Sequence, residues 1–362
     1  MTAETDAPLG VAVIGAGYWG PNLVRNFRAS LEWDLVAVCD LDTERARDVV
    51  GAQGGAGAGI EVTDDLTALL AREDVAAVAI ATPARTHRAL AEQALHAGKH
   101  VLVEKPLADS VEAGRAMVEL ARRNDLILMT DHTFCYTPAV QRIRELVEDG
   151  SLGEILFVDS VRINLGLVQP DVDVFWDLAP HDLSILDYVL LGGLQPIGVA
   201  AQGGDPLSAG KSCLGYLSLP LAGGAMAHVH VNWLSPTKIR QMVIGGSKRT
   251  LVWDDLNPQQ RLSVFDRGVD LIQQSVDSAD RRTASINYRL GDTWAPALPE
   301  REALGEMVRE YAAAIREHRD PATDGDAGLR VLSVLEAAQT SLRAHGALVE
   351  VETSAPMLEI VR

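Results

Sequence analysis

Two distant stretches of the chain carry residues whose types and spacing suit proton transfer to and from an alcohol. Asp177 and His181 are four residues apart, so on a helix they lie on one face and point into the same cleft. A histidine with a near-neutral pKa can take a proton from a hydroxyl, and a carboxylate beside it orients the ring and favours the imidazolium that forms. Lys105 precedes Pro106 at the end of an apolar run typical of a buried strand, so it is aimed into the crevice at the strand's carboxyl end. We predict Lys105, Asp177 and His181 as a catalytic set.

Each member of this set also has a simpler explanation. Lys105 can be a solvated surface lysine, and Asp177 with His181 can be an ion pair on the surface. Pro180 would interrupt a helix through them unless it lies in the first turn. Zinc is a further alternative, but no second histidine stands at a helical spacing from His181 and no cysteine is near it in the sequence. We therefore predict no metal site.

A glycine-rich turn near the start of the chain is typical of a nucleotide-binding fold. The apolar residues 11–14 have the character of a strand and end in Gly15-Ala16-Gly17-Tyr18-Trp19-Gly20. In such a turn the first glycine bends the chain, the second lets the backbone approach a pyrophosphate, and the third lets the helix pack close to the strand. The N–H groups that open the helix then face the phosphates. The turn alone is a weak signal, since glycine turns are common.

Asp40 strengthens that signal and bears on the choice of cofactor. It ends a second apolar run, residues 35–39, about twenty residues after the turn, where a carboxylate accepts hydrogen bonds from the adenosine ribose hydroxyls. A carboxylate there repels a 2′-phosphate, so we predict NAD rather than NADP, and tighter binding of NADH than of NADPH. Arg45 in the next helix is the feature that favours NADP. The alternative is an ordinary strand–helix–strand unit with a solvated aspartate.

The ends of two later strands complete the predicted cofactor site. Thr82-Pro83 follows the fourth apolar run, where the proline turns the chain outward, and Glu104-Lys105-Pro106 follows the fifth. Ligands of a parallel sheet bind at the carboxyl ends of its strands. The residues predicted to contact the cofactor are Gly15, Gly17, Tyr18, Trp19, Gly20, Asp40, Thr82, Pro83, His87, Glu104 and Lys105.

Composition argues against several classes of function. The chain has 362 residues, enough for two domains, and its net charge of -18 leaves no dense basic face for nucleic acid. Cys39, Cys135 and Cys213 are odd in number and far apart, so neither a disulfide framework nor a zinc knuckle is predicted. Residues 1–8 are polar without an apolar core, and no later run is as long as a membrane span. These features predict a cytoplasmic protein that binds neither nucleic acid nor membrane.

Strands and helices alternate in the first third of the chain, whereas strands follow one another in much of the rest. Residues 1–131 are therefore predicted to form an α/β domain with a parallel sheet. Residues 132–362 are predicted to form an α+β domain with a large, mostly antiparallel open sheet, which must hide one face against helices, another subunit, or both. The predicted helices are residues 43–50, 64–71, 84–97, 110–124, 137–148, 176–190, 302–318 and 324–345, and the predicted strands are residues 11–14, 35–39, 75–81, 100–103, 126–129, 155–164, 197–201, 212–219, 225–233, 238–244, 250–253 and 262–265, with the glycine-rich residues 51–59 as a linker.

The ordered set of motifs resembles the glucose-fructose oxidoreductase, inositol dehydrogenase and rhizopine-catabolism family (Gfo/Idh/MocA) over nearly the whole chain. The resemblance implies a Rossmann domain, a second domain whose open sheet forms homodimers or homotetramers, and NAD(P)-dependent redox chemistry on a sugar or cyclitol. It also implies that Lys105 hydrogen-bonds the reacting hydroxyl and that Asp177 and His181 complete the proton-handling set. Glu104 would help to place Lys105.

Two stretches, residues 17–23 and 176–182, are similar to family members that act at C3 of UDP-N-acetylglucosamine derivatives, which favours a nucleotide-linked sugar as substrate. Tyr136-Thr137-Pro138 departs from the family pattern, because many members place an arginine before this proline. Tyr136, Arg162 and Asn164 are the predicted substrate contacts. Arg162 could instead pair with an acidic neighbour, and Tyr136 could belong to the core.

Other functions fit the same motifs. Inositol or cyclitol dehydrogenases and antibiotic-sugar 3-ketoreductases share this architecture, and Lys105 rather than His181 is the base if burial lowers its pKa. A different class is an NAD-binding sensor or transcriptional co-regulator without turnover. The complete set of Lys105, Asp177 and His181 argues against it, because a pure binder has no chemical need for these residues.

Overall fold

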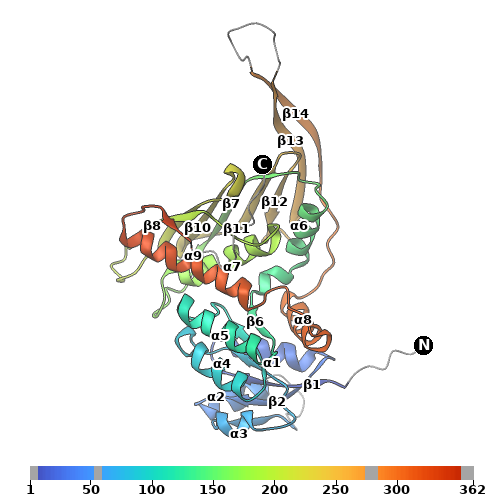
Figure 1. Cartoon of the computed structure of the whole chain (residues 1–362), viewed down its shortest axis with the longest axis vertical. Coiled ribbons are helices and arrows are strands. Elements are labelled where there is room, and N and C mark those ends of the chain that lie inside the picture. Colours follow the sequence, from blue (N-terminus) through green and yellow to red (C-terminus); the bar gives the residue numbers. More distant parts are fainter. Residues whose placement is uncertain (1–6, 53–58, 274–283, 352–362) are drawn as a thin grey trace, which may run out of the picture.

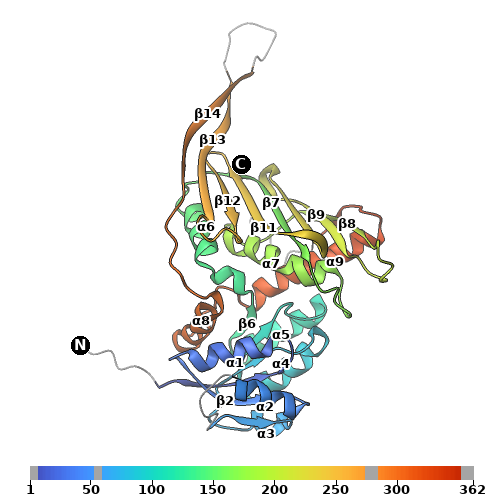
Figure 2. The same ribbon diagram turned by 180° about the vertical axis from the view of Figure 1, so that it is seen from behind.

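A parallel sheet at one end of the molecule and a larger mixed sheet at the other define its two halves (Figures 1 and 2). The computed structural model describes residues 7–52, 59–273 and 284–351. The polar N-terminus and the glycine-rich linker interpreted from the sequence fall mainly on residues 1–6 and 53–58, which lie outside the described residues. The predicted fold, an α/β domain followed by an α+β domain with a mostly antiparallel open sheet, is confirmed.

The first sheet is parallel throughout, in the order β3-β2-β1-β4-β5-β6. Its central strands are buried on both faces, as expected where helices cover both sides. Ile14 pairs with Ile80 and Ile80 with Val103, so the strands end together and the residues after them share one edge. The order reverses beside β1, which places the ligand crevice at that edge. The strands are β1 (Leu9–Ile14), β2 (Trp33–Cys39), β3 (Glu61–Thr63), β4 (Ala77–Ile80), β5 (His100–Glu104) and β6 (Leu128–Asp131).

Two helices of the first half begin at residues whose side chains cap them. Asp65 and Ser110 each accept a hydrogen bond from the backbone N–H three residues further on, at the starts of α3 and α5. Pro21 occupies the first turn of α1, where its missing N–H removes no helical hydrogen bond. The helices are α1 (Gly20–Ala29), α2 (Thr43–Ala52), α3 (Leu66–Leu70), α4 (His87–His96) after the short 3-10 helix η1 (Ala84–Thr86), and α5 (Val111–Arg123).

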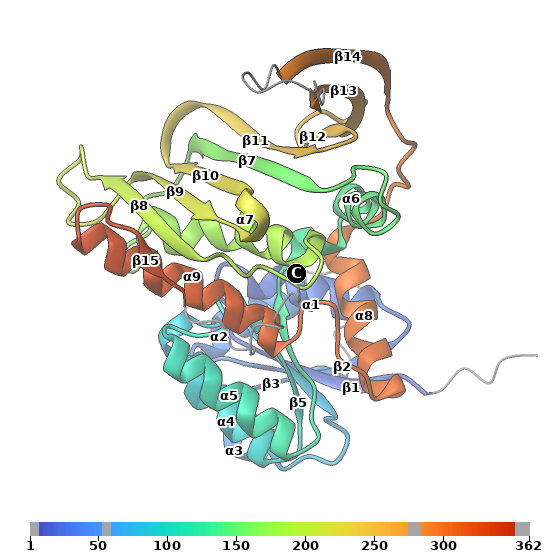
Figure 3. The ribbon, with the colours of Figure 1, turned by 45° about the horizontal axis from the view of Figure 1, so that its top comes forward.

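The second sheet runs in the order β14-β13-β12-β11-β7-β10-β9-β8-β15 and is antiparallel except where β10 pairs with β7. Helices α7 and α9 pack against one face (Figure 3). In the described part of the chain no helix covers the other face. The elements are β7 (Ile155–Leu165), β8 (Gly198–Gly204), β9 (Leu214–Pro220), β10 (Met226–Asn232), β11 (Leu234–Gly246), β12 (Thr250–Asp254), β13 (Leu262–Gln273), β14 (Ala284–Trp294), β15 (Val349–Glu350), α6 (Pro138–Glu148), α7 (Val174–Val189), α9 (Gly325–Arg343) and the 3-10 helices η2 (Thr133–Tyr136) and η3 (Ala222–Gly224).

The pair β13 and β14 differs most from the predicted strands. The sequence predicts a strand over residues 262–265 only, whereas β13 extends to Gln273 and pairs with β14, which no predicted strand covers. The two strands project beyond the sheet as a ribbon (Figures 1 and 2). Apolar side chains on it, such as Tyr288 and Leu290, are exposed. The sequence of the ribbon lacks a clear alternation of apolar and polar residues, so it gives little signal of a strand.

Helix α8 (Ala303–Glu317) comes late in the chain but packs against the first sheet. Met307 and Tyr311 belong to the same buried cluster as Trp33 of β2. The Trp33 indole Nε1–H donates to the carbonyl oxygen of Val308 at 2.7 Å, and its ring stacks on Tyr311 with 5.1 Å between the centroids. The predicted domain boundary at residue 131 stays a prediction. By its packing α8 belongs with the first sheet, although it follows that boundary in the chain.

We expect Trp33→Phe to lower the free energy of unfolding by about 1 kcal/mol, because it removes one buried hydrogen bond and keeps an aromatic ring against Tyr311. Urea unfolding followed by circular dichroism measures the change. Trp294→Phe is the matched control, because Trp294 is 37% exposed, and it should change the free energy by less than about 0.5 kcal/mol. Equal values for the two variants would show that the bond to α8 contributes nothing.

Candidate active site

The side chain of Lys105 crosses from the first sheet to the second half of the molecule. Its ammonium donates to the backbone carbonyl oxygen of Asp177 at 2.9 Å and lies 3.5 Å from the carboxylate Oδ1 of the same residue. Lys105 directly follows β5, and Asp177 lies in the first turn of α7. Their side chains are 14% and 20% exposed, so both remain accessible from the crevice. Two predicted catalytic residues that are distant in the sequence are thus in contact.

Asp177 is held from a second side by Trp233. The Trp233 indole Nε1–H donates to Asp177 Oδ2 at 2.9 Å, and the Trp233 ring is fully buried. Pro180 was expected to be tolerated only in the first turn of a helix. It lies further inside α7, and the helix continues through it. A proline removes the N–H that would bond to the carbonyl of Trp176, and it loosens that turn. The carbonyl of Asp177, in the same turn, accepts the bond from Lys105.

His181 lies one turn after Asp177 on α7 and is half-buried. Its ring packs edge-on against Phe134, with 5.1 Å between the centroids. Burial lowers the pKa of His181 well below its ordinary value, and the positive charges of Lys105, Arg162 and Arg240 lower it further. The imidazole is therefore neutral at neutral pH, which is the form that a general base requires.

The ends of β5 and β6 bring two carboxyl groups together. Glu104 pairs with Asp131 in the register of these strands, and burial together with the charge of Asp131 raises the pKa of Glu104 well above its usual value. The carboxylate of Asp131 accepts hydrogen bonds from the indole Nε1–H of Trp19 at 3.0 Å and from the hydroxyl of Thr133. The bond from Trp19 to Asp131 ties the glycine turn to the end of β6, beside Glu104.

The glycine turn has the shape needed to hold a dinucleotide. Gly15 has a φ of +103°, and a Cβ there would meet the backbone of Ala81 at 2.9 Å. A Cβ on Gly20 would lie 2.2 Å from the carbonyl oxygen of Gly15, so strand and helix can approach only at a glycine. A Cβ on Gly17 would meet no atom within 4 Å, so the backbone there is open to a ligand. These three environments match the three roles of a pyrophosphate-binding turn.

Asp40 lies against this turn. Its carboxylate accepts hydrogen bonds from the backbone N–H of Ala16 at 2.6 Å and of Asp42 at 2.8 Å, and pairs with Arg45 at 2.6 Å. Burial acts to raise the pKa of Asp40, but these hydrogen bonds outweigh it and the pKa lies below its ordinary value. Asp40 is therefore ionised, and Arg45, the residue that favoured NADP, is paired with it.

Other residues predicted to contact the cofactor differ in their exposure. Tyr18 is 91% exposed beside the turn. His87 is buried, and its ring nitrogens contact the carbonyl oxygens of Thr82 at 2.7 Å and Pro106 at 3.0 Å. The position of His87 thus corrects the prediction, because the ring joins the turns that follow β4 and β5 instead of facing the crevice. Thr82 and Pro83 lie in the first of these turns.

The residues predicted to contact the substrate also differ in how far they are buried. Arg162 is buried and forms a bidentate ion pair with Asp182 at 2.7 and 3.0 Å, which is the alternative weighed for it in the sequence. Tyr136 is buried, and its hydroxyl is 3.0 Å from that of Thr323, so it is a core residue and its predicted substrate contact is corrected. Asn164 lies two residues after Arg162 on the same, helix-covered face of β7. It is half-buried near Trp233. Its contact with the substrate stays a prediction.

Two residues at the site were not predicted, namely His132 and Trp233. His132 directly follows β6, and the rule that ligands bind at strand ends would have found it if β6 had been predicted to end at Asp131. Trp233 follows β10, and nothing in its spacing indicates its bond to Asp177. In the described residues no group of three or more His, Cys, Asp or Glu side chains could hold a metal ion. None of the described helices is both long and apolar enough to cross a membrane.

Comparison with known families assigns both halves of the chain. Residues 9–132 match the model of the oxidoreductase family with an NAD-binding Rossmann fold, GFO_IDH_MocA. Residues 140–252 match the GFO/IDH/MocA C-terminal domain. The chain is 30% identical over 324 residues to UDP-N-acetylglucosamine 3-dehydrogenase from Acidithiobacillus ferrooxidans, covering 89% of this chain and 93% of that protein. It is 26% identical over 343 residues to inositol 2-dehydrogenase from Rhizobium meliloti, covering 91% and 96% of the two chains.

Solved structures show the same arrangement of both domains. The structure of the Acidithiobacillus ferrooxidans UDP-N-acetylglucosamine 3-dehydrogenase, GnnA, matches with a TM-score of 0.77 at 27% identity, over 94% of this chain and 99% of that chain. GenD2 from gentamicin A biosynthesis, solved in complex with NAD, matches with a TM-score of 0.76 at 25% identity, over 96% and 97%. The glycine turn and Asp40 described above fit NAD, which is the cofactor of this fold.

We expect Gly17→Ala to weaken NADH binding by at least about tenfold, equivalent to about 1.4 kcal/mol, because the added methyl group fills the space through which the pyrophosphate approaches the backbone. A fluorescence titration with NADH measures the dissociation constant. Gly51→Ala is the matched control, because a Cβ there also meets no atom within 4 Å, and it should leave binding unchanged. Unaltered binding in Gly17→Ala would place the pyrophosphate elsewhere.

Proposed function

The chain belongs to the Gfo/Idh/MocA family of NAD-binding oxidoreductases that act on CH–OH groups, and we propose that its substrate is a nucleotide-linked sugar that is oxidised or reduced at C3. The observation that carries the proposal is the contact of Lys105 with Asp177, one helical turn from His181. It joins the sheet that holds the cofactor to the helix that carries the base.

The similarity to a UDP-N-acetylglucosamine 3-dehydrogenase over nearly the whole chain supports this choice of substrate. Inositol 2-dehydrogenase and GenD2, the second being a protein of antibiotic biosynthesis, are similar over comparable lengths, so cyclitols and antibiotic sugars are the alternatives. We assign Asn164 to the substrate side of the site. Arg162 is buried by its pairing with Asp182, and we propose that it supports α7 and makes no contact with the substrate.

The chemistry follows from the protonation states of the residues. NAD, when bound, accepts the hydride from the carbinol carbon, or NADH returns it. His181 is neutral and takes the hydroxyl proton, while the Lys105 ammonium donates a hydrogen bond to the same oxygen as negative charge develops there. Asp177 fixes the position of the Lys105 ammonium, and Trp233 fixes Asp177. We assign His181 the role of base because its unprotonated ring can accept the proton, while Lys105 is held by Asp177.

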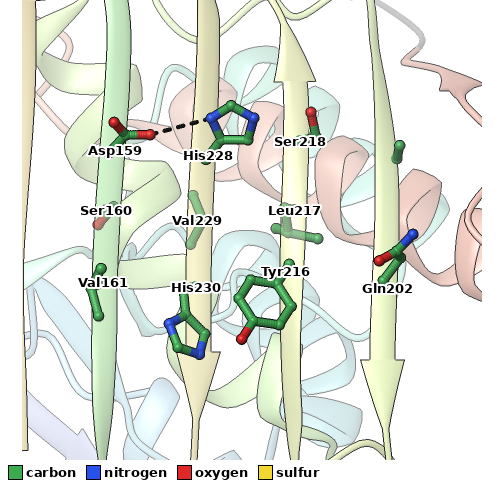
Figure 4. Close-up of a pocket in the computed structure, with 11 residues that line it drawn as sticks. Asp159, Ser160, Val161, Gln202, Tyr216, Leu217, Ser218, His228, Val229 and His230 are labelled. Atoms are coloured by element: carbon green, nitrogen blue, oxygen red, sulfur yellow. Dashed lines mark hydrogen bonds and ion pairs between the residues drawn. The ribbon is translucent and has the colours of Figure 1, made fainter.

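The uncovered face of the second sheet is our proposed subunit interface. Figure 4 shows Tyr216, His228 and His230 side by side on β9 and β10, with Asp159 on β7. The Tyr216 ring stacks on His230 with 4.4 Å between the centroids, and His228 Nδ1 pairs with Asp159 Oδ1 at 3.2 Å. They line a shallow hollow of about 340 Å³. We propose that a second copy covers this face to form a homodimer or homotetramer, and that the protein is cytoplasmic, with Cys39, Cys135 and Cys213 free and buried.

We expect the wild-type protein to produce NADH when UDP-N-acetylglucosamine is supplied with NAD. Production of NADH from myo-inositol or D-glucose should be weak at most. The rate should be lower with NADP, because Asp40 is ionised beside the ribose site. Lys105→Ala should abolish turnover, while the dissociation constant for NADH stays within about twofold, since Lys105 acts on the reacting oxygen.

Lys248→Ala, in the turn between β11 and β12, is the control and should keep full activity. Turnover retained in Lys105→Ala would remove this lysine from the mechanism. If no member of the panel is oxidised while NADH still binds, the sensor or co-regulator class is favoured.

Sedimentation velocity should give a mass that is two or four times the 38.8 kDa of one chain. Tyr216→Glu should shift the protein toward monomer, because a carboxylate in a closed interface is desolvated without a partner. Leu31→Glu is the control, because Leu31 is also an apolar residue but is 91% exposed on the first half of the molecule. A monomeric wild type, or an unshifted Tyr216→Glu, would contradict the interface.

A further inference from the structure

Four enclosed nitrogen atoms around His181 lack hydrogen-bond partners in the described structure. They are both ring nitrogens of His132, Nδ1 of His181 and Nη1 of Arg162. His132 and Arg162 are 1% and 2% exposed as whole residues. Buried polar atoms are nearly always paired, because an unpaired one loses its hydrogen bonds to water and gains none in return. Such a group of atoms at one place indicates a polar interaction that operates in the working enzyme.

The strand register places His132 beside the catalytic residues. Glu104 pairs with Asp131, so Lys105 and His132 are the next residues along two paired strands. Phe134, two residues after His132, packs against the His181 ring. His132 therefore follows its strand beside Lys105 and comes two residues before the aromatic ring that packs against His181.

His132 can offer one donor and one acceptor. Burial, together with the charge of Lys105, lowers the pKa of His132 to about 3, so the ring stays neutral. A neutral imidazole has one N–H and one unprotonated nitrogen. His181 must keep Nε2 unprotonated to act as a base there, so its own hydrogen must lie on Nδ1, which then requires an acceptor.

We propose that His132 is a positioning residue for His181, and that one internal water molecule joins Nδ1 of His181 to the imidazole of His132. A water molecule in such a place makes about three hydrogen bonds, and Nη1 of Arg162 is the additional donor. The link holds the hydrogen of His181 on Nδ1 and leaves Nε2 facing the crevice. When His181 takes a proton, the same link stabilises the imidazolium against the nearby cations.

This inference rests on the proposed role of His181 as the base, but its main test needs no substrate. Proton–nitrogen correlation spectra of protein labelled with ¹⁵N in its nine histidines report which nitrogen of each ring carries hydrogen. His181→Asn assigns the His181 signals. We expect the Nδ1–H form of His181 in the wild type at pH 7.5, and a shift toward the Nε2–H form in His132→Phe.

His132→Gln is the conservative variant, because its amide retains a donor and an acceptor, and we expect it to keep the Nδ1–H form. It also keeps the test decisive if His132→Phe fails to fold, since the wild-type spectrum and the glutamine variant remain. An Nε2–H form in the wild type, or the same spectrum for the phenylalanine variant as for the wild type, would overturn the proposal.

A kinetic readout separates positioning from a structural role. With any oxidised member of the sugar panel, His132→Phe should lower kcat by about 10- to 100-fold, which is less than the full effect of about 10²–10⁴-fold for a general base, and leave KM within about twofold. The acid limb of kcat/KM should move to lower pH, because the imidazolium loses its acceptor. Rescue of kcat by His132→Gln supports the proposal, whereas equal losses in both variants would indicate packing alone. If no sugar is oxidised, the proposed function fails and the spectra still decide this inference.

Discussion

The contact between the Lys105 ammonium and Asp177 is the constraint on which the functional site depends. It connects the carboxyl end of β5, in the sheet that holds the cofactor, to the first turn of α7, under the second sheet. A hydrogen bond from a charged donor to a carbonyl and a carboxylate is stronger in a partly enclosed place than in water. This interaction joins the strand end beside the nucleotide turn to the helix that carries His181, and the packing of α9 against α5 and β6 adds further contacts between the two halves.

The protonation states around this contact follow from burial and from unequal pairing of charges. Arg162 and Arg240 are each matched by an aspartate, Asp182 and Asp255, but they still add to the positive potential at His181. Burial, together with that potential, keeps the imidazole neutral. At the ends of β5 and β6, burial and the charge of Asp131 raise the pKa of Glu104.

One face of the second sheet supports the helix whose side chains line this crevice. Its inner face supports α7 through Arg162 and Trp233, and this support aims Asp177 and His181 at the strand ends of the first sheet. Its outer face has no helical cover in the described residues, which leaves it free for assembly. Helix α8 returns to the first sheet through Trp33, so the two halves are linked by the chain as well as by the active-site contact. The proposed chemistry and the proposed assembly therefore use opposite faces of the same sheet.

The sequence by itself determined the features that local patterns encode: the glycine turn, the aspartate after β2, the residues at the strand ends and the spacing of Asp177 and His181. Each depends on backbone conformation or on periodicity within a few residues, so the signal is readable along the chain. Only the tertiary structure decided that Tyr136 and His87 are buried, that Arg162 pairs with Asp182, and that His132 and Trp233 belong to the site. These outcomes depend on partners brought together by sheet register and domain packing, because a side chain's partner 19 to 187 positions away leaves no periodic trace in the sequence.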